Sequence, residues 1–256
     1  MSDKIVYGVE RSILILLLLL AWELCPRLGV VDPFLLPPLS LVLERLFLLV
    51  QSGKLFVHLV ASFQRSFGGF VLALLFSIPA GFLIAWSRSF RKYVDPVLQV
   101  FRSIPILALY PVFILFFGLG EASKISVIFY GSLWPTLLNT ITGVNGIDPL
   151  LVKSARSMGI SSIGLFFKVI LPSALPSIFT GIRLSAASAI LLLIAAEMLG
   201  ARRGMGYLIF YSEEKFDIPE MFGGILVIAF VGLLLNYTLV YCEKRLTVWK
   251  QAAKED

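Results

Sequence analysis

Long apolar runs separated by short polar segments make up most of the chain. A helix needs about 20 consecutive, mostly apolar residues to cross a bilayer, and six runs reach or approach that length. They cover residues 8–25, 67–86, 94–119, 125–143, 178–199 and 221–241. The pattern predicts an all-α membrane protein with six transmembrane helices.

Residues 148–176, called the elbow below, differ from these runs because the elbow contains many polar residues. Asp148 suits an N-cap, and Pro149 suits the first helical position, where its missing N–H is not needed. Gly159 suits a helix end, because glycine adopts the left-handed conformation without strain. The elbow therefore begins with a short helix, too short to span a membrane.

This short helix has two different sides by three- and four-residue spacing. The apolar side carries Leu151, Val152, Ala155 and Met158, and the polar side carries Lys153, Arg156 and Ser157. A second short helix is expected after Ser161 or Ser162, and Pro172 and Pro176 are expected to break or redirect the chain. Two interpretations remain open: an amphipathic helix on the lipid headgroups, or a docking surface for another protein.

Composition places the chain in a bilayer. Hydrophobic residues make up 58% and charged residues only 15%, which is too apolar for a soluble domain whose surface must be wetted. The net charge of +6 is scattered between apolar runs, which argues against a nucleic-acid partner. Cys25 and Cys242 have neither metal-ligand spacing nor a disulfide framework. We expect a single membrane domain over residues 1–256, with no metal site.

The distribution of basic residues predicts the orientation. Six spans put both termini on the same side as the elbow. That side holds Arg88, Arg91, Lys92, Lys153, Arg156, Lys168, Lys244, Arg245, Lys250 and Lys254. The positive-inside rule makes it cytoplasmic, although the pair Arg202 and Arg203 on the opposite side reduces the bias.

The elbow carries a recognisable motif. Ala155, Gly159, Val169, Leu171 and Pro172 match the spacing A-x3-G-x9-[IV]-x-L-P. With this "EAA" loop, the chain resembles the permease subunits of ABC importers. Further similarity to their nitrate, sulfonate, taurine and bicarbonate branch is carried by FRSIP at 101–105, FFGLGE at 116–121, LNT at 138–140 and AEMLG at 196–200. Lys153 and Ser154 depart from the Glu and Ala usual in that family, which puts any contact made by that Glu in doubt.

The resemblance implies a type I ABC importer permease fold with a cytoplasmic coupling helix, in a bacterial inner membrane. It also implies a second permease subunit, forming a homodimer or a close heterodimer, two cytoplasmic ATPase subunits and an extracytoplasmic solute-binding protein. ATP and Mg would bind to the partner ATPase, and this chain would hold no cofactor.

The sequence argues against catalysis in this chain. It contains no G-x-x-x-x-G-K-[ST] loop to cradle nucleotide phosphates and a single histidine, His58. We therefore expect no catalytic residue and a function in coupling and passage. The residues expected to contact the ATPase or shape that contact are Leu151, Val152, Ala155, Arg156, Met158, Gly159, Leu171 and Pro172.

Charged residues inside apolar runs are the candidates for a translocation pathway, because an arginine at the centre of a membrane helix costs about 2.5–3.5 kcal/mol. Arg102, Arg183 and Glu197 are such residues, and Ser103 and Asn139 add polar groups. Each has a structural alternative. The arginines can extend to the headgroups, Glu197 can form an ion pair within the subunit, and the polar residues can bond to a neighbouring helix.

Three other classes were weighed. Ser154-Ala155-Arg156 is similar to the Ala-Arg motifs of the transmembrane T subunit of energy-coupling-factor vitamin transporters, but the EAA spacing favours the importer permease. A secondary transporter would need paired acidic residues or inverted repeats at mid-membrane, and an intramembrane enzyme would need a nucleophile and a base. The identity of the solute is left open.

Overall fold

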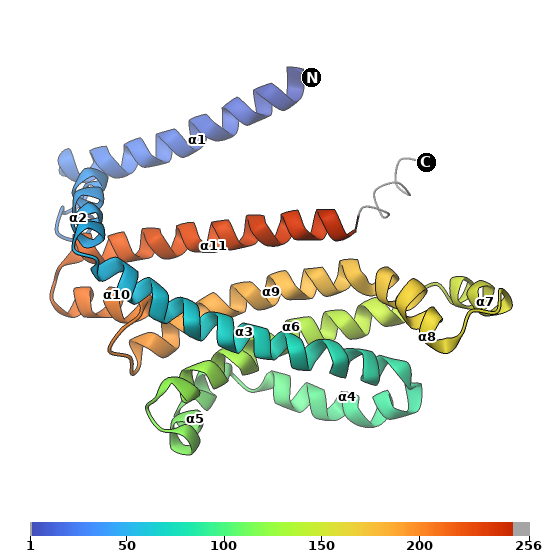
Figure 1. Cartoon of the computed structure of the whole chain (residues 1–256). Helices are drawn as coiled ribbons and strands as arrows, with labels where there is room; N and C mark the ends of the chain where they lie inside the picture. The colour runs from blue at the N-terminus through green and yellow to red at the C-terminus, as the bar shows by residue number, and fades with distance from the viewer. Residues whose placement is uncertain (1, 248–256) are drawn as a thin grey trace.

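The computed structural model describes residues 2–247, and every regular element in that range is a helix (Figure 1). The elements are α1 Ser2–Arg27, α2 Leu39–Gln51, α3 Lys54–Trp86, α4 Arg88–Ser103, the 3₁₀ turn η1 Ile106–Leu109, α5 Tyr110–Phe117, α6 Glu121–Asn145, α7 Pro149–Ser157, α8 Ser162–Leu165, the π-helical turn η2 Phe166–Ile170, α9 Leu171–Met198, α10 Met205–Glu214 and α11 Ile218–Leu246. The predicted helical class is confirmed for this range.

Helices α3, α6 and α9 pack against one another and form the core. On α3, Gly69, Ala73, Ser77 and Gly81 recur every fourth residue and are buried. Small residues at this spacing let two helix backbones approach closely. A Cβ on Gly81 would lie only 2.7 Å from Cβ of Thr140 on α6, so the α3–α6 contact depends on this pattern.

The α6–α9 contact combines a second glycine with buried hydroxyl groups. A Cβ on Gly181 would lie 2.9 Å from the carbonyl oxygen of Pro135. Nearby, the Ser185 hydroxyl donates to the backbone carbonyl of Ser132 at 2.5 Å and lies 2.7 Å from the Thr136 hydroxyl. These bonds satisfy polar groups that have no access to solvent, so they hold α6 and α9 in one register.

Among residues 2–247, three helices are long and apolar enough to cross a membrane: Lys54–Trp86, Ser162–Met198 and Ile218–Leu246. A fourth span is possible if the bent pair Ser89–Ser103 and Ile106–Phe117 counts as one. Six spans are therefore not confirmed. The predicted spans 8–25 and 125–143 do form helices, α1 and α6, but neither belongs to this set.

The prolines within the predicted span 94–119 indicate a bent helix, but the segment is not one continuous helix. The α4 helix ends at Ser103, the chain bends by 83°, and η1 and α5 follow. Pro105 explains the break, because a proline disfavours helical geometry in the residue before it, and Ile104 has extended backbone angles of φ −74° and ψ 125°.

Pro172 and Pro176 do not interrupt the chain as expected. Pro172 lies in the first turn of α9, where its missing N–H is not needed. The π-helical turn η2 comes directly before it, with the Leu171 N–H bonded to the Phe166 carbonyl. As a result the helix from Ser162 to Met198 is continuous through both prolines.

The packing of α3 against α6 gives a test with a neighbouring control. A Cβ on Gly69 would lie 2.7 Å from Cγ2 of Ile128 and 2.9 Å from the Ile125 carbonyl oxygen, whereas one on Gly68 meets nothing closer than 3.9 Å. Overpacking of this kind costs about 1–3 kcal/mol. We expect Gly69→Val to lower the apparent melting temperature in detergent by roughly 3–10 °C and Gly68→Val to change it little. Equal shifts would contradict the assigned contact.

Candidate functional site

The elbow has the local structure that its sequence predicts. The Asp148 side chain accepts a hydrogen bond from the Leu150 N–H at 2.8 Å and caps α7. Gly159 has a φ of +74° just after that helix. The side chain of Ser161 then accepts from the Gly164 N–H and caps α8. Two caps and a left-handed glycine therefore fix the two short helices at a set angle.

Part of the predicted contact side of α7 packs inside the chain. Ala155 is 3% exposed and forms a buried cluster with Leu165 and Ile170, and Val152 packs partly against the same cluster. In this conformation Ala155 therefore packs within its own chain rather than facing a partner, whereas Val152 is half-buried and its contact with a partner stays a prediction. Ala155 is small because α7 lies close to α8 and η2.

The exposed apolar side chains of the elbow form a different set from the predicted one. Leu151 and Met158 are exposed as predicted, at 46% and 73%. Sequence reasoning missed Leu150, Ile163 and Phe167, which are also exposed. Leu150 lies two residues after the cap Asp148 and outside the three- and four-residue spacing of the apolar side. The positions of Ile163 and Phe167 depend on the turns after Gly159.

The other predicted elbow residues lie around this set. Arg156 and Gly159 are exposed, whereas Leu171 and Pro172 are half-buried at the start of α9. Leu171 lines an apolar surface groove that also includes Phe82 of α3 and Phe166 of η2. The two phenyl rings pack edge to face with their centroids 5.0 Å apart, so the elbow packs directly against α3.

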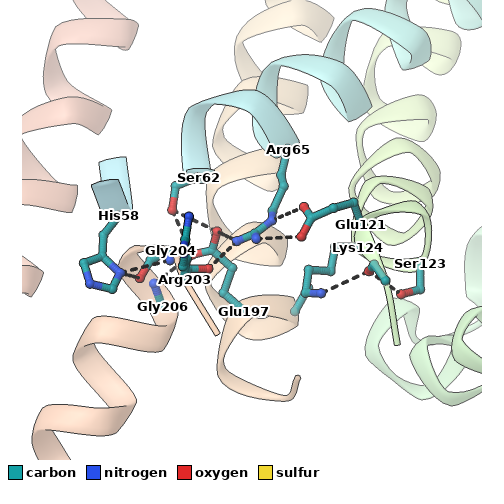
Figure 2. A network of polar contacts seen from close by, with 12 residues as sticks. His58, Ser62, Arg65, Glu121, Ser123, Lys124, Glu197, Arg203, Gly204 and Gly206 are labelled. Atoms are coloured by element: carbon teal, nitrogen blue, oxygen red, sulfur yellow. Dashed lines mark hydrogen bonds and ion pairs between the residues drawn. The ribbon is translucent and has the colours of Figure 1, made fainter. Parts of the chain in front are cut away.

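A network of charged and polar residues lies away from the elbow, where α3 and α6 begin and α9 ends (Figure 2). Arg65 of α3 donates to Glu197 of α9 at 2.7 Å and to Glu121 of α6 at 2.5 and 2.8 Å. It also donates to the backbone carbonyl of Arg203. One guanidinium thus connects α3 to α6, to α9 and to the loop before α10. Sequence reasoning placed Arg65 outside the second span and missed this role.

Glu197 is completely buried, and both its carboxylate oxygens are satisfied. The Ser62 hydroxyl lies 2.8 and 2.9 Å from them, and the Gly206 N–H donates at 2.8 Å. Gly204 has a φ of +131°, and a Cβ there would lie 2.2 Å from the Glu197 carboxyl carbon. His58 adds a contact with the Gly204 N–H at 3.1 Å. The structure therefore supports the alternative of an ion pair within the subunit, and burial keeps Glu197 from contacting a solute in this conformation.

A second set of ion pairs connects surface segments beside this network. Arg45 of α2 bonds to Asp217 and lies 3.2 Å from Glu220, both at the start of α11. The Asp217 carboxylate, which accepts its hydrogen bond, raises the pKa of the Arg45 guanidinium above its usual value. The surface helix α2 is thereby fixed to the turn between α10 and α11.

The predicted pathway residues do not come together. Arg102 and Ser103 are exposed at the end of α4, and the Ser103 hydroxyl donates to the Gln99 carbonyl at 2.7 Å. Arg183 of α9 pairs with Glu243 of α11 at 3.1 Å. The side-chain amide of Asn139 donates to the Pro135 carbonyl on its own helix. Among the five, only Arg102 combines exposure with donors that no described contact occupies.

Within residues 2–247, no three His, Cys, Asp or Glu side chains gather in a way that could hold a metal ion.

The buried pair Arg65 and Glu197 gives a second test. Removing one member leaves the other charge buried without its partner, which typically costs about 3–5 kcal/mol. We expect Arg65→Met and Glu197→Met each to lower the apparent melting temperature in detergent, and the double variant to lose clearly less than the sum. Additive losses would contradict direct coupling between the two side chains.

Comparison with known proteins agrees with the motif in the elbow. Residues 77–246 match the family described as binding-protein-dependent transport system inner membrane component. The chain is 38% identical to the putative aliphatic sulfonates transport permease protein SsuC of Bacillus subtilis, over 96% of this chain and 90% of that one. It is 34% identical to the taurine transport system permease protein TauC of Escherichia coli, over 91% and 86%.

A solved structure shares the fold. A chain of the MetNI methionine ABC transporter, from a study of its inward facing conformations, aligns with a TM-score of 0.67 over 77% of this chain and 98% of its own, at 18% identity. The family match and the relatives together settle the classification: the chain belongs to the family of inner membrane components of binding-protein-dependent transport systems, the permeases of ABC importers.

Proposed function

We propose that this chain forms the translocation pathway of an ATP-driven importer for a small oxyanion of the sulfonate, taurine, nitrate or bicarbonate type, and couples to a cytoplasmic ATPase through α7. The family match and two relatives named for sulfonate and taurine transport support this proposal. The observation that carries the coupling is the exposed apolar set on the elbow, Leu150, Leu151, Met158, Ile163 and Phe167. Such a set on a short helix suits insertion into a groove of a partner.

The elbow is built to pass force to the core. Its buried side, with Ala155 and Leu165, is packed against α3 and η2 through Phe82 and Phe166. From Ser162 onward it continues into α9, because Ser162–Met198 is one continuous helix. A displacement of α7 by the ATPase would therefore move α9 as a rigid rod, whose far end is held by Glu197.

The proposed assembly contains two copies of this permease, two ATPase subunits and an extracytoplasmic solute-binding protein, in a bacterial inner membrane. ATP and Mg would be held by the ATPase. Six spans with cytoplasmic termini remain part of the proposal, although the terminal residues 1 and 248–256 lie outside the described residues. Because the chain belongs to the importer permease family, the T subunit of an energy-coupling-factor transporter and a secondary transporter lose the support they had.

Dependence on the ATPase tests the overall function. Proteoliposomes containing the permease, its ATPase and its binding protein should accumulate taurine or ethanesulfonate against a gradient when ATP is enclosed with the ATPase. An ATPase variant that binds but does not hydrolyse ATP should stop this accumulation while the permease stays inserted. Continued concentrative uptake with that variant would refute an ATP-driven mechanism.

The contact between elbow and ATPase is tested by two exposed positions on α7 and its C-cap. We expect Met158→Asp to reduce ATP-dependent uptake and co-purification of the ATPase by at least about tenfold, because it places a charge in an apolar contact. Ser157→Asp is the control, since Ser157 is also exposed but belongs to the polar side of the helix. Loss of function in both variants, or in neither, would contradict the proposed contact side.

A further inference from the structure

The α4 helix has an unusual distribution of polar residues for a segment of a membrane protein. At 100° per residue, its charged and amide side chains fall within about one third of its circumference. These residues are Arg91, Lys92, Asp95, Gln99 and Arg102, with Ser103 at the end, and are called the polar stripe below. The remaining surface carries aromatic and branched apolar residues.

The α4 helix lies alongside the core rather than on a surface beyond it. After the single residue between the two helices, α4 turns back along α3, and Val94 and Leu98 pack against the buried cluster of Ile84 and Leu137 (Figure 1). At its C-terminal end, the Tyr130 hydroxyl donates to the carbonyl of Phe101 at 2.7 Å.

The bond from Tyr130 fixes the depth of Arg102, the next residue after Phe101. Tyr130 lies nine residues after the start of α6 and fifteen before its end, or roughly 14 and 22 Å at 1.5 Å per residue. The last turn of α4 is therefore level with the middle part of α6. Where α6 crosses a bilayer, this level lies below the headgroups, and Arg102 lies there with it.

Part of the polar stripe is exposed on the surface of the chain. Lys92, Gln99 and Arg102 are all exposed. Arg91 and Asp95 pair with each other at 3.1 Å, and among the described residues no carboxylate lies within ion-pair distance of Lys92 or Arg102. Charged side chains at membrane depth avoid hydrocarbon and face protein or water. The side chains that α4 turns away from its own core therefore need a polar environment.

We propose that the polar stripe of α4 is one wall of a water-filled route that attracts oxyanions, and that Arg102 and Gln99 are its deepest solute-contacting groups. This inference rests on the proposed function and adds the location and the chemistry of the route. Arg102 offers a planar guanidinium suited to the oxygens of a sulfonate, and Gln99 lies three residues away on the same side. Lys92 lies ten residues before Arg102, about 15 Å along the axis, and supplies charge nearer the elbow.

The end of the stripe is defined by the backbone. At Ile104 and Pro105 the chain bends by 83°, so the stripe does not continue along α5. The Phe101 carbonyl freed by this bend accepts bonds from Tyr130 and from the Ile104 N–H. Arg102 lies two residues before this bend and is exposed, and its positive charge favours an anion over a cation.

Cysteine accessibility tests the route without depending on transport. In a chain whose Cys25 and Cys242 are replaced by serine, Gln99→Cys is compared with Val100→Cys. Val100 is 65% exposed but lies outside the stripe. The complete transporter in proteoliposomes is treated with 2-sulfonatoethyl methanethiosulfonate, an anion, and with its trimethylammonioethyl analogue, a cation, and labelling rates are taken relative to a free thiol.

We expect the cysteine at position 99 to react at least about tenfold faster than the one at position 100, because a thiolate forms only where water reaches it. We also expect the anionic reagent to be favoured there. Adding Arg102→Gln should lower the ratio of anionic to cationic rates by roughly fourfold to tenfold, as for loss of one unit charge a few ångströms away in a watery medium. Arg102→Lys should restore most of the ratio.

Equal, slow labelling at positions 99 and 100 would overturn the route. A rate ratio that does not change with Arg102→Gln would overturn the attraction of oxyanions. Neither result would affect the proposed function, because ATP-dependent uptake is measured in parallel with the chain in which only Cys25 and Cys242 are replaced. Loss of uptake in the background lacking both cysteines, with fast labelling at position 99 retained, would instead count against the transport assay and leave the route supported.

Discussion

The structure depends on close contact between the backbones of α3, α6 and α9. Lipid tails are as apolar as leucine side chains, so helices in a bilayer gain little from the hydrophobic effect and associate through packing and hydrogen bonds. Glycine at positions 69, 81 and 181 permits that packing, and the hydroxyl groups of Ser185 and Thr136 add bonds in its interior. Because these contacts leave no room for sliding, the two ends of the core are connected rigidly. This core fixes the separation between the elbow at one end and the charged network at the other.

The two ends of the core differ in the kind of side chains that they carry. At the end of α9, Arg65 and Glu197 are buried, and each is bonded to several groups from different segments. Breaking such a pair leaves a charge without a partner, so this end resists rearrangement. At the elbow, the buried cluster around Ala155 holds α7 to α8, while Leu150 and Met158 remain without a cover in this chain. A partner protein can thus bind the exposed side chains of the elbow without unfolding it.

Local features of the fold could be predicted from sequence, and tertiary ones could not. The caps at Asp148 and Ser161 and the left-handed Gly159 involve residues within three positions of each other, so the sequence contains the whole interaction. The prolines within 94–119 indicated a bent helix but not a complete break after Ser103, because only the tertiary position of α5 decides between a kink and a sharp bend. The partner of Glu197 lies 132 residues away, and nothing in its neighbourhood indicates Arg65. For Ala155, spacing identified the correct side of α7 but not whether this chain or another covers it.

The polar stripe lies in the half of the molecule that contains the elbow. It begins at the end of α4 that follows Trp86, close to where Phe82 meets the elbow through Phe166, and it stops level with the middle of α6. The charges on α4 that lack a partner therefore lie in the half of the molecule nearer the elbow, whereas the buried, fully bonded charges lie in the other half. A solute that has passed the network end would meet the deepest cation, Arg102, first and would then move toward Lys92. On the proposed route these cations attract an anion from either side, because a fixed charge sets no direction, and reaching them requires breaking no buried pair.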